Sequence, residues 1–130
     1  MIIDHMGFGV ADYERSKAFY TAALAPLGIR LMTEIAAKDN ISLHAAAGFG
    51  RDGEPLFWIG AEGRTRPFMH IAFAAQNRAQ VDGFHAAAVA AGATDNGAPG
   101  LRPQYHPHYY AAFVLDLDGH NIEAVCHTPA

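Results

Sequence analysis

The sequence predicts an α+β fold of two βαβββ modules, whose curved mixed sheets form a cup with the helices outside. Three observations support this prediction: an internal repeat, two strands with alternating faces, and two helical stripes that follow them. When the sequence is shifted by 65 residues (70 − 5), His5 falls on His70, Phe8 on Phe73 and Asp12 on Asn77. The 130 residues are therefore expected to form one domain, with modules at about residues 1–63 and 64–130.

Each half opens with a predicted strand that has two unlike faces. In residues 2–10 and 68–75, one face carries large apolar side chains, whereas the other carries His5 or His70, mostly among small residues. Alternate residues of a strand point to opposite sides of the sheet. We therefore expect the apolar faces to pack on helices and the histidine faces to leave room for a ligand.

A helix is predicted after each of these strands. Asp12 and Asn77 are suitable N-caps, and Pro26, Gly28 and Gly92 are stop signals. Between them, small and apolar residues recur with helical spacing. The stripes are Ser16, Phe19, Tyr20, Ala23, Leu24 and Leu27, and then Val81, Phe84, His85, Ala88, Val89 and Gly92.

Three short strands should follow each helix. In the first half they are predicted near residues 29–36, 41–48 and 55–60. In the second half the first strand is poorly marked within residues 94–105, because residues 97–103 have the composition of a loop. Residues 109–115 and 121–126 are predicted to form a hairpin, with a turn at residues 116–119.

Composition excludes several classes of function. The net charge is −4 and the basic residues form no stripe, which argues against a nucleic-acid partner. No apolar run is long enough to span a membrane, and the first residues lack a signal-peptide pattern, so we expect a cytoplasmic protein. The single cysteine, Cys126, excludes an intrachain disulfide and is expected to be a small buried hydrophobe. Eight histidines favour metal or acid–base chemistry.

The repeat relates four positions that should face the cup. Glu123 lies opposite the apolar face of its strand, and subtracting 65 from its number leads to Trp58. His5 and His70 occupy the matching positions on the opening strands. Two histidines and one carboxylate are a ligand set that leaves coordination sites open for a substrate.

These motifs resemble the vicinal oxygen chelate superfamily over essentially the whole chain. The resemblance rests on His5, on residues 12–20 (Asp-Tyr-Glu-Arg-Ser-Lys-Ala-Phe-Tyr), on residues 67–73 (Pro-Phe-Met-His-Ile-Ala-Phe) and on residues 115–123 (Leu-Asp-Leu-Asp-Gly-His-Asn-Ile-Glu). The superfamily includes glyoxalase I, type I extradiol dioxygenases, fosfomycin thiol transferases and bleomycin-resistance proteins.

The resemblance implies that His5, His70 and Glu123 are ligands of a divalent metal: Fe, Mn, Ni or Zn. Glyoxalase I usually has a glutamate ligand at the position of Trp58, which cannot bind a metal. The dioxygenases and thiol transferases tend to have a tyrosine ten residues before the glutamate, where this chain has Phe113. The subclass therefore stays open between a glyoxalase-like lyase and an extradiol dioxygenase.

Further candidates flank this constellation. Besides Glu123, acid–base roles are considered for His106, His108 and Tyr110. Contacts with the substrate are considered for Trp58, Arg102, Tyr105, Tyr109 and Phe113. The other histidines are interpreted as structural: His85 as packed or capping, and His44, His120 and His127 as surface residues.

Two functions follow from these expectations. The first is a small metal-dependent enzyme that chelates vicinal oxygens of a small substrate and stabilises the anion that develops. The alternative is a metal-free binding protein of the bleomycin-resistance type, in which aromatic walls bind the ligand and the negative net charge suits a cationic one. A homodimer is expected in either case, although the sequence does not decide whether the modules pair within one chain or between two.

Overall fold

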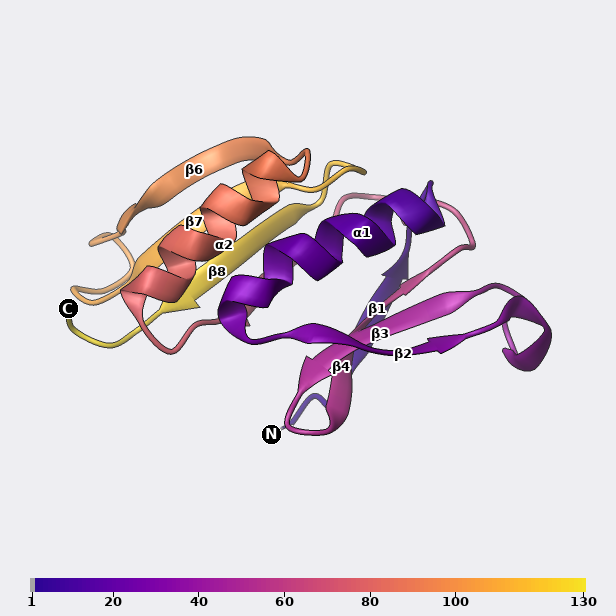
Figure 1. The fold of residues 1–130 in the computed structure, drawn as a ribbon. Helices are drawn as coiled ribbons and strands as arrows, with labels where there is room; N and C mark the ends of the chain where they lie inside the picture. Colours follow the sequence, from indigo (N-terminus) through magenta and orange to yellow (C-terminus); the bar gives the residue numbers. More distant parts are fainter. Residues whose placement is uncertain (1) are drawn as a thin grey trace.

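The computed structural model describes residues 2–130 and confirms the α+β fold of two βαβββ modules (Figure 1). The first four-stranded sheet has the order β1-β4-β3-β2 and the second has the order β5-β8-β7-β6. In each sheet the opening strand pairs in parallel with the last strand, and the other neighbours are antiparallel. Within residues 2–130, no helix is long and apolar enough to cross a membrane.

The elements of the first module follow the predicted order. It consists of β1 (Met6–Gly9), α1 (Tyr13–Leu24), β2 (Arg30–Ile35), β3 (Ala46–Arg51) and β4 (Glu54–Gly60), with 3₁₀ turns η1 (Ala25–Leu27) and η2 (Ala37–Asp39). The predicted strand at residues 41–48 thus begins later, at Ala46, because the chain first passes through η2 and a turn.

The second module consists of β5 (His70–Ala74), α2 (Arg78–Ala90), β6 (Thr94–Leu101), β7 (Tyr110–Leu115) and β8 (Asn121–Cys126). The interpretation of residues 97–103 as a loop was wrong for residues 97–101, which belong to β6. β6 is an edge strand, where Pro99 is tolerated because one side of the strand needs no ladder hydrogen bonds. The pairing of β6 with β7 shifts register near Gly97 and Gly100, which lets this irregular segment remain paired with β7.

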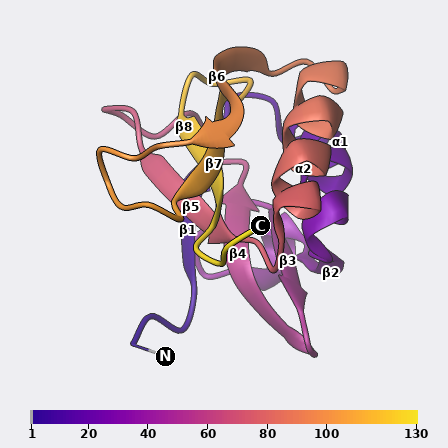
Figure 2. The same ribbon diagram turned by 90° about the vertical axis from the view of Figure 1, so that its left-hand side faces the viewer.

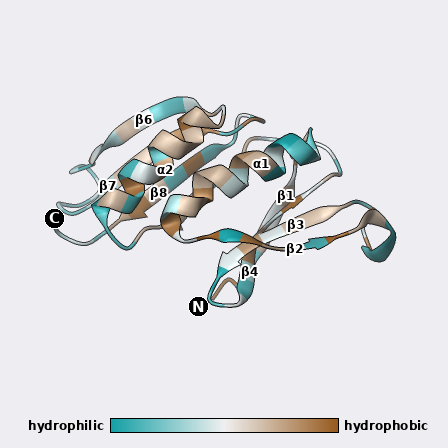
Figure 3. Cartoon of the chain, viewed as in Figure 1, coloured by the Kyte–Doolittle hydropathy of each residue, from teal (hydrophilic) through white to brown (hydrophobic). Residues whose placement is uncertain are grey.

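Both helices lie along one side of the molecule and pack against one another (Figure 2). The Asp12 and Asn77 side chains accept hydrogen bonds from the backbone N–H groups of Arg15 and Gln80, as expected of N-caps. The helices bury most of the predicted stripes, but Val89 is exposed. α1 begins with a hydrophilic turn, and β2 carries hydrophilic stretches (Figure 3).

One hydrophobic core joins the two modules. Phe57 of β4 packs edge-on against Phe73 of β5, with ring centroids 5.3 Å apart. Cys126 is fully buried in this core, as predicted.

The turn between β7 and β8 forms a buried polar junction with the first module. The Tyr20 hydroxyl of α1 donates to Asp116 at 2.5 Å, and the Asp116 carboxylate also accepts from the backbone N–H groups of Asp118 and His120. Burial, followed by the charge of Asp116, raises the pKa of Tyr20 well above its ordinary value. The Ala11 N–H donates to the Asp118 carboxylate and adds a second link between the modules.

The interpretation of His120 as a surface residue was wrong, because its side chain is fully buried at this junction. Its Nδ1 accepts from the Met69 N–H at 2.9 Å, and its ring lies 4.5 Å from that of Phe8. The imidazole packs between the two modules, and its Nε2 has no hydrogen-bond partner in residues 2–130. His44 and His127 are exposed, as predicted, and His85 is partly buried and hydrogen-bonded to Asp95.

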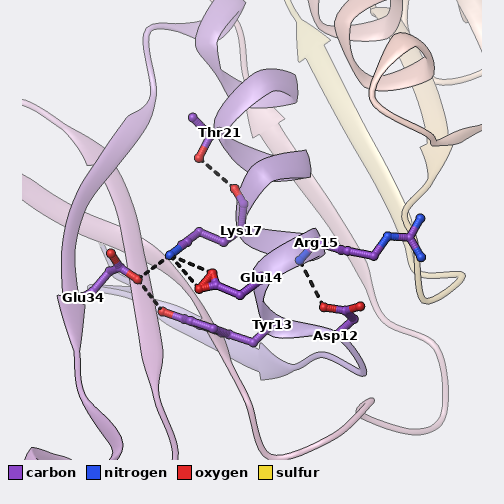
Figure 4. A network of polar contacts seen from close by, with 7 residues as sticks. All are labelled: Asp12, Tyr13, Glu14, Arg15, Lys17, Thr21 and Glu34. Atoms are coloured by element: carbon purple, nitrogen blue, oxygen red, sulfur yellow. Dashed lines mark hydrogen bonds and ion pairs between the residues drawn. The ribbon is translucent and has the colours of Figure 1, made fainter.

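A surface ion-pair network links α1 to β2 (Figure 4). Lys17 Nζ lies 2.8 Å from Glu34 and 3.0 Å from Glu14, and the Tyr13 hydroxyl donates to Glu34. The hydrogen bond from Lys17 is the main cause that lowers the pKa of Glu34. Burial and the bond to Glu34 raise the pKa of Tyr13 to about 12.

Replacing Glu34 with glutamine should lower the free energy of unfolding only slightly, by less than about 1 kcal/mol at neutral pH, because the network is exposed. A carboxyl with a lowered pKa stabilises the fold above its unfolded-state pKa and loses that contribution as pH falls through its folded-state pKa. The difference between parent and variant should therefore disappear in acid. Urea unfolding at neutral pH and in acid measures the difference in the free energy of unfolding between parent and variant, with Glu54→Gln as the control. A difference that persists in acid would contradict a stabilising ion pair between Lys17 and Glu34.

Candidate functional site

His70 and Glu123 meet on the open face of the second sheet. His70 begins β5, and Glu123 lies in β8 with Ala72 and Phe113 as its partners on the two neighbouring strands. Glu123 is only 2% exposed, whereas the His70 side chain is half-exposed. The predicted pairing of these two residues therefore exists within one module.

The hydrogen bonds around His70 define its protonation at one nitrogen. Nδ1 lies 3.0 Å from the backbone carbonyl of Asn121, and a carbonyl can only accept, so Nδ1 carries a proton. The other nitrogen, Nε2, lies 3.1 Å from Glu123 Oε1. A neutral His70 would thus point a lone pair at a carboxylate oxygen, which is favourable only if a proton or a metal cation lies between the two atoms.

The second oxygen of Glu123 is also engaged. The Tyr109 hydroxyl donates to Glu123 Oε2 at 2.5 Å. Burial, followed by this hydrogen bond, raises the pKa of Tyr109 to about 12, so that the hydroxyl keeps its proton at neutral pH. Tyr109 therefore acts as a fixed donor that orients the carboxylate.

A hollow of about 580 Å³ lies over these groups. The loop between β6 and β7 provides one side of it, and His106 of this loop is tied to His127 by a 2.8 Å contact between Nε2 and Nδ1. The hollow is lined by His70, Tyr105, His106, Tyr109, Phe113, Asn121 and Glu123. Four of the predicted substrate and acid–base residues thus surround the pair of His70 and Glu123.

Three other candidates lie elsewhere or bind within the protein. The Tyr110 hydroxyl donates to Asp82 of α2, on the helix side of the sheet. The Arg102 guanidinium donates to the carbonyls of Ala98 and Gly100 and lies over the Phe113 ring. The His108 side chain is exposed and does not line this hollow. Their predicted roles remain untested predictions.

His5 and Trp58 lie on the open face of the first sheet, as the repeat predicts. They share a hollow of about 410 Å³ that contains no residue of the second module. His5 Nδ1 contacts its neighbour Asp4 at 2.6 Å, and both side chains are exposed. Across residues 2–130, no three His, Cys, Asp or Glu side chains are grouped closely enough to hold a metal. One chain therefore brings together two of the three predicted ligands.

Sequence reasoning missed two features of these faces. The Asn121 carbonyl orients His70 through its backbone, which no side-chain pattern reveals. Glu62 lines a second hollow beside Trp58, and it lies after the end of β4, outside any strand alternation.

Comparison with known proteins agrees with this fold. The family model described as Glyoxalase/Bleomycin resistance protein/Dioxygenase superfamily matches residues 2–124. The chain belongs to this superfamily. A glyoxalase/bleomycin resistance protein from Albidiferax ferrireducens T118 has a similar crystal structure, with 31% identity, a TM-score of 0.78, and coverage of 98% of this chain and 100% of that one.

More distant structures share the fold. Glyoxalase I from Zea mays has 20% identity and a TM-score of 0.72, and the match covers 98% of this chain but only 45% of the maize protein. A mutant of the fosfomycin resistance protein FosX from Listeria monocytogenes, complexed with Mn(II) and 1S,2S-dihydroxypropylphosphonic acid, has 21% identity and a TM-score of 0.67, over 98% and 95% of the two chains. No curated protein matches the chain.

Proposed function

We propose that this protein is a homodimeric enzyme that binds a small substrate on a divalent metal, with His70 and Glu123 as ligands from one chain and His5 of the partner subunit as the third. The main support is the close approach of His70 Nε2 to Glu123 Oε1, which lie 3.1 Å apart. Two ligands that each lie about 2.1 Å from one ion at a right angle are separated by roughly 3.0 Å. The donor set therefore fits a metal.

The surroundings of both ligands also fit a metal. Metal-binding histidines usually donate their second N–H to a carbonyl or carboxylate, as His70 does to Asn121. The hydrogen bond from Tyr109 leaves Glu123 Oε1 free to face the histidine. Glu123 is buried without a Lys or Arg ion pair in residues 2–130, so a cation would compensate its charge.

A bound divalent metal would supply Lewis-acid stabilisation of an oxyanion that develops on a substrate with adjacent oxygen atoms. The residues of the chain would perform the remaining tasks. Tyr105 and Phe113 would hold the substrate against the sheet. Both ring nitrogens of His106 are engaged, by His127 and by the His108 N–H, so His106 would shape the rim of the site. Tyr109 stays protonated at neutral pH and would hold Glu123 in place.

The proposed homodimer rests on the division of the ligands between two hollows. The hollow that His5 shares with Trp58 and the hollow over His70 and Glu123 have no residue in common, although His5 also borders a cavity of about 260 Å³ with Ile71–Ala74 of β5. A second copy would place its first module over the second module of this chain, and symmetry would create two such sites.

Elemental analysis of the protein purified without chelator tests the metal. The parent should contain about one equivalent of Fe, Mn, Ni or Zn per chain, and the His70→Ala variant almost none, because two ligands cannot retain the ion. His44→Ala, which removes an exposed histidine, should keep the metal of the parent. If the parent lacks metal even after divalent ions are added, the proposal is wrong, and the metal-free binding protein becomes the better interpretation.

A further inference from the structure

The open face of the first sheet is unusually bare. Four glycines of β1, β3 and β4 lie on it around the indole of Trp58, and we name them the glycine floor: Gly7, Gly9, Gly48 and Gly60. Glycine within a strand is less stable than alanine, and it often marks a place where another group approaches the backbone closely. The glycines therefore lower the stability of these strands but leave their backbone accessible to other groups.

Two side chains use this access. The indole of Trp58 lies against Gly48, where an added Cβ would be 2.9 Å from Cη2 and Cζ2 of the ring. The Glu62 carboxylate lies over Gly60 and occupies the place of a Cβ there. Any larger residue at Gly48 or Gly60 would displace the ring or the carboxylate. The glycine floor therefore allows both groups to lie close to the backbone of the sheet.

Open space remains beside both groups. A hollow of about 350 Å³ is bounded by Trp58, Glu62, Thr65 and part of the glycine floor. It adjoins the hollow of about 410 Å³ that contains His5, and the two share Gly7, Ala46 and Trp58. The indole thus stands between two hollows with its surface partly exposed, and a flat group can lie beside it.

The charge of this face is negative. Within residues 2–130, the Glu62 carboxylate has no ion-pair partner within 4.0 Å, and neither hollow is lined by Lys or Arg. Arg64, on the same loop, lies over the Phe68 ring. The Thr65 hydroxyl accepts from the Gly9 N–H and helps to hold the loop that carries Glu62.

We propose that this face binds a planar cationic group of the substrate, such as an aromatic amidinium, which stacks on Trp58 and donates N–H groups to Glu62. An indole attracts a cation through its π face, and a carboxylate accepts charge-assisted hydrogen bonds from it. The inference rests on the proposed function only in placing the substrate in this cup. It adds the chemical class of the substrate group that would lie on the first-module face, opposite His70 and Glu123.

Binding of benzamidinium to the intact protein tests this assignment. Trp58 is the only tryptophan, so its single indole N–H resonance reports on this face. Benzamidinium should shift this resonance saturably. Benzamide, which is neutral and of the same shape, should bind at least about fivefold more weakly, as should benzamidinium to the Glu62→Gln variant.

Glu14→Gln is the matched control, because it removes an exposed carboxylate on α1, on the helix side of the sheet. It should leave the affinity for benzamidinium unchanged. Equal affinities for benzamide and benzamidinium, no effect of Glu62→Gln, or no shift of the indole resonance would each overturn the assignment. The result is independent of the metal: His70→Ala should still bind benzamidinium, so loss of the metal proposal alone leaves this binding intact.

Discussion

Mixing the His5→Ala and His70→Ala variants should restore metal binding that neither variant has alone. If each site takes His5 from one chain and His70 with Glu123 from the other, a mixed dimer contains one intact site and one doubly defective site. Random exchange of equal amounts makes about half of the dimers mixed, so about a quarter of all sites should regain the metal. Elemental analysis after unfolding and joint refolding measures this recovery.

The control is the same procedure with each variant alone, which should stay without metal. A second control mixes His70→Ala with Glu123→Ala, whose defects lie in the same module, so no mixed dimer has an intact site. Recovery in the first mixture but not in the second would support a site shared between chains. If the parent binds the metal and the first mixture shows no recovery, the three ligands belong to one chain and the shared site is wrong.

Replacing Asp116 with alanine should destabilise the protein strongly, by about 3 kcal/mol, because several buried donors lose their acceptor together. These donors are the Tyr20 hydroxyl and the N–H groups of Asp118 and His120. The carboxylate belongs to the turn between β7 and β8, which contacts the first module through Tyr20, so the loss should lower the midpoint of urea unfolding in a single transition.

Tyr20→Phe separates the two parts of this effect. It removes one donor and leaves the carboxylate with its backbone partners, so it should cost less, about 1–2 kcal/mol. Asp52→Gly, on an exposed turn where Asp52 has a positive φ, should change stability little, because glycine adopts this φ without strain. A free energy of unfolding for Asp116→Ala equal to that of the parent would show that the junction does not hold the modules together.

Much of the fold could be predicted because each strand and helix pattern of the first module recurs in the second. The caps Asp12 and Asn77 and the alternation around His70 describe local geometry, which the sequence determines directly. The pairing of His70 with Glu123 was also predictable, since strand alternation selects the face of each residue. His120 was misjudged because its burial depends on Phe8, a residue of the other module.

The remaining differences arise where one residue or one contact decides the outcome. Residues 109 and 110 are neighbours of the same type, yet the Tyr109 hydroxyl reaches Glu123 and the Tyr110 hydroxyl reaches Asp82 on the helix side. Strand alternation counted back from Phe113, the partner of Glu123, places Tyr109 on the site face and Tyr110 on the helix face, so this difference was open to prediction. The separation of His5 from His70 depends on how α1 packs on α2, which no local pattern encodes.

The aromatic contact between Phe57 and Phe73 has a consequence for the origin of this architecture. A single βαβββ module cut from the chain would expose one of these rings and lose the junction that buries His120. Such a fragment would have to associate with a copy of itself to cover that surface. An ancestral gene encoding one module would therefore have produced a self-associating protein. Duplication with fusion would have turned that association into an intramolecular one, which does not depend on protein concentration.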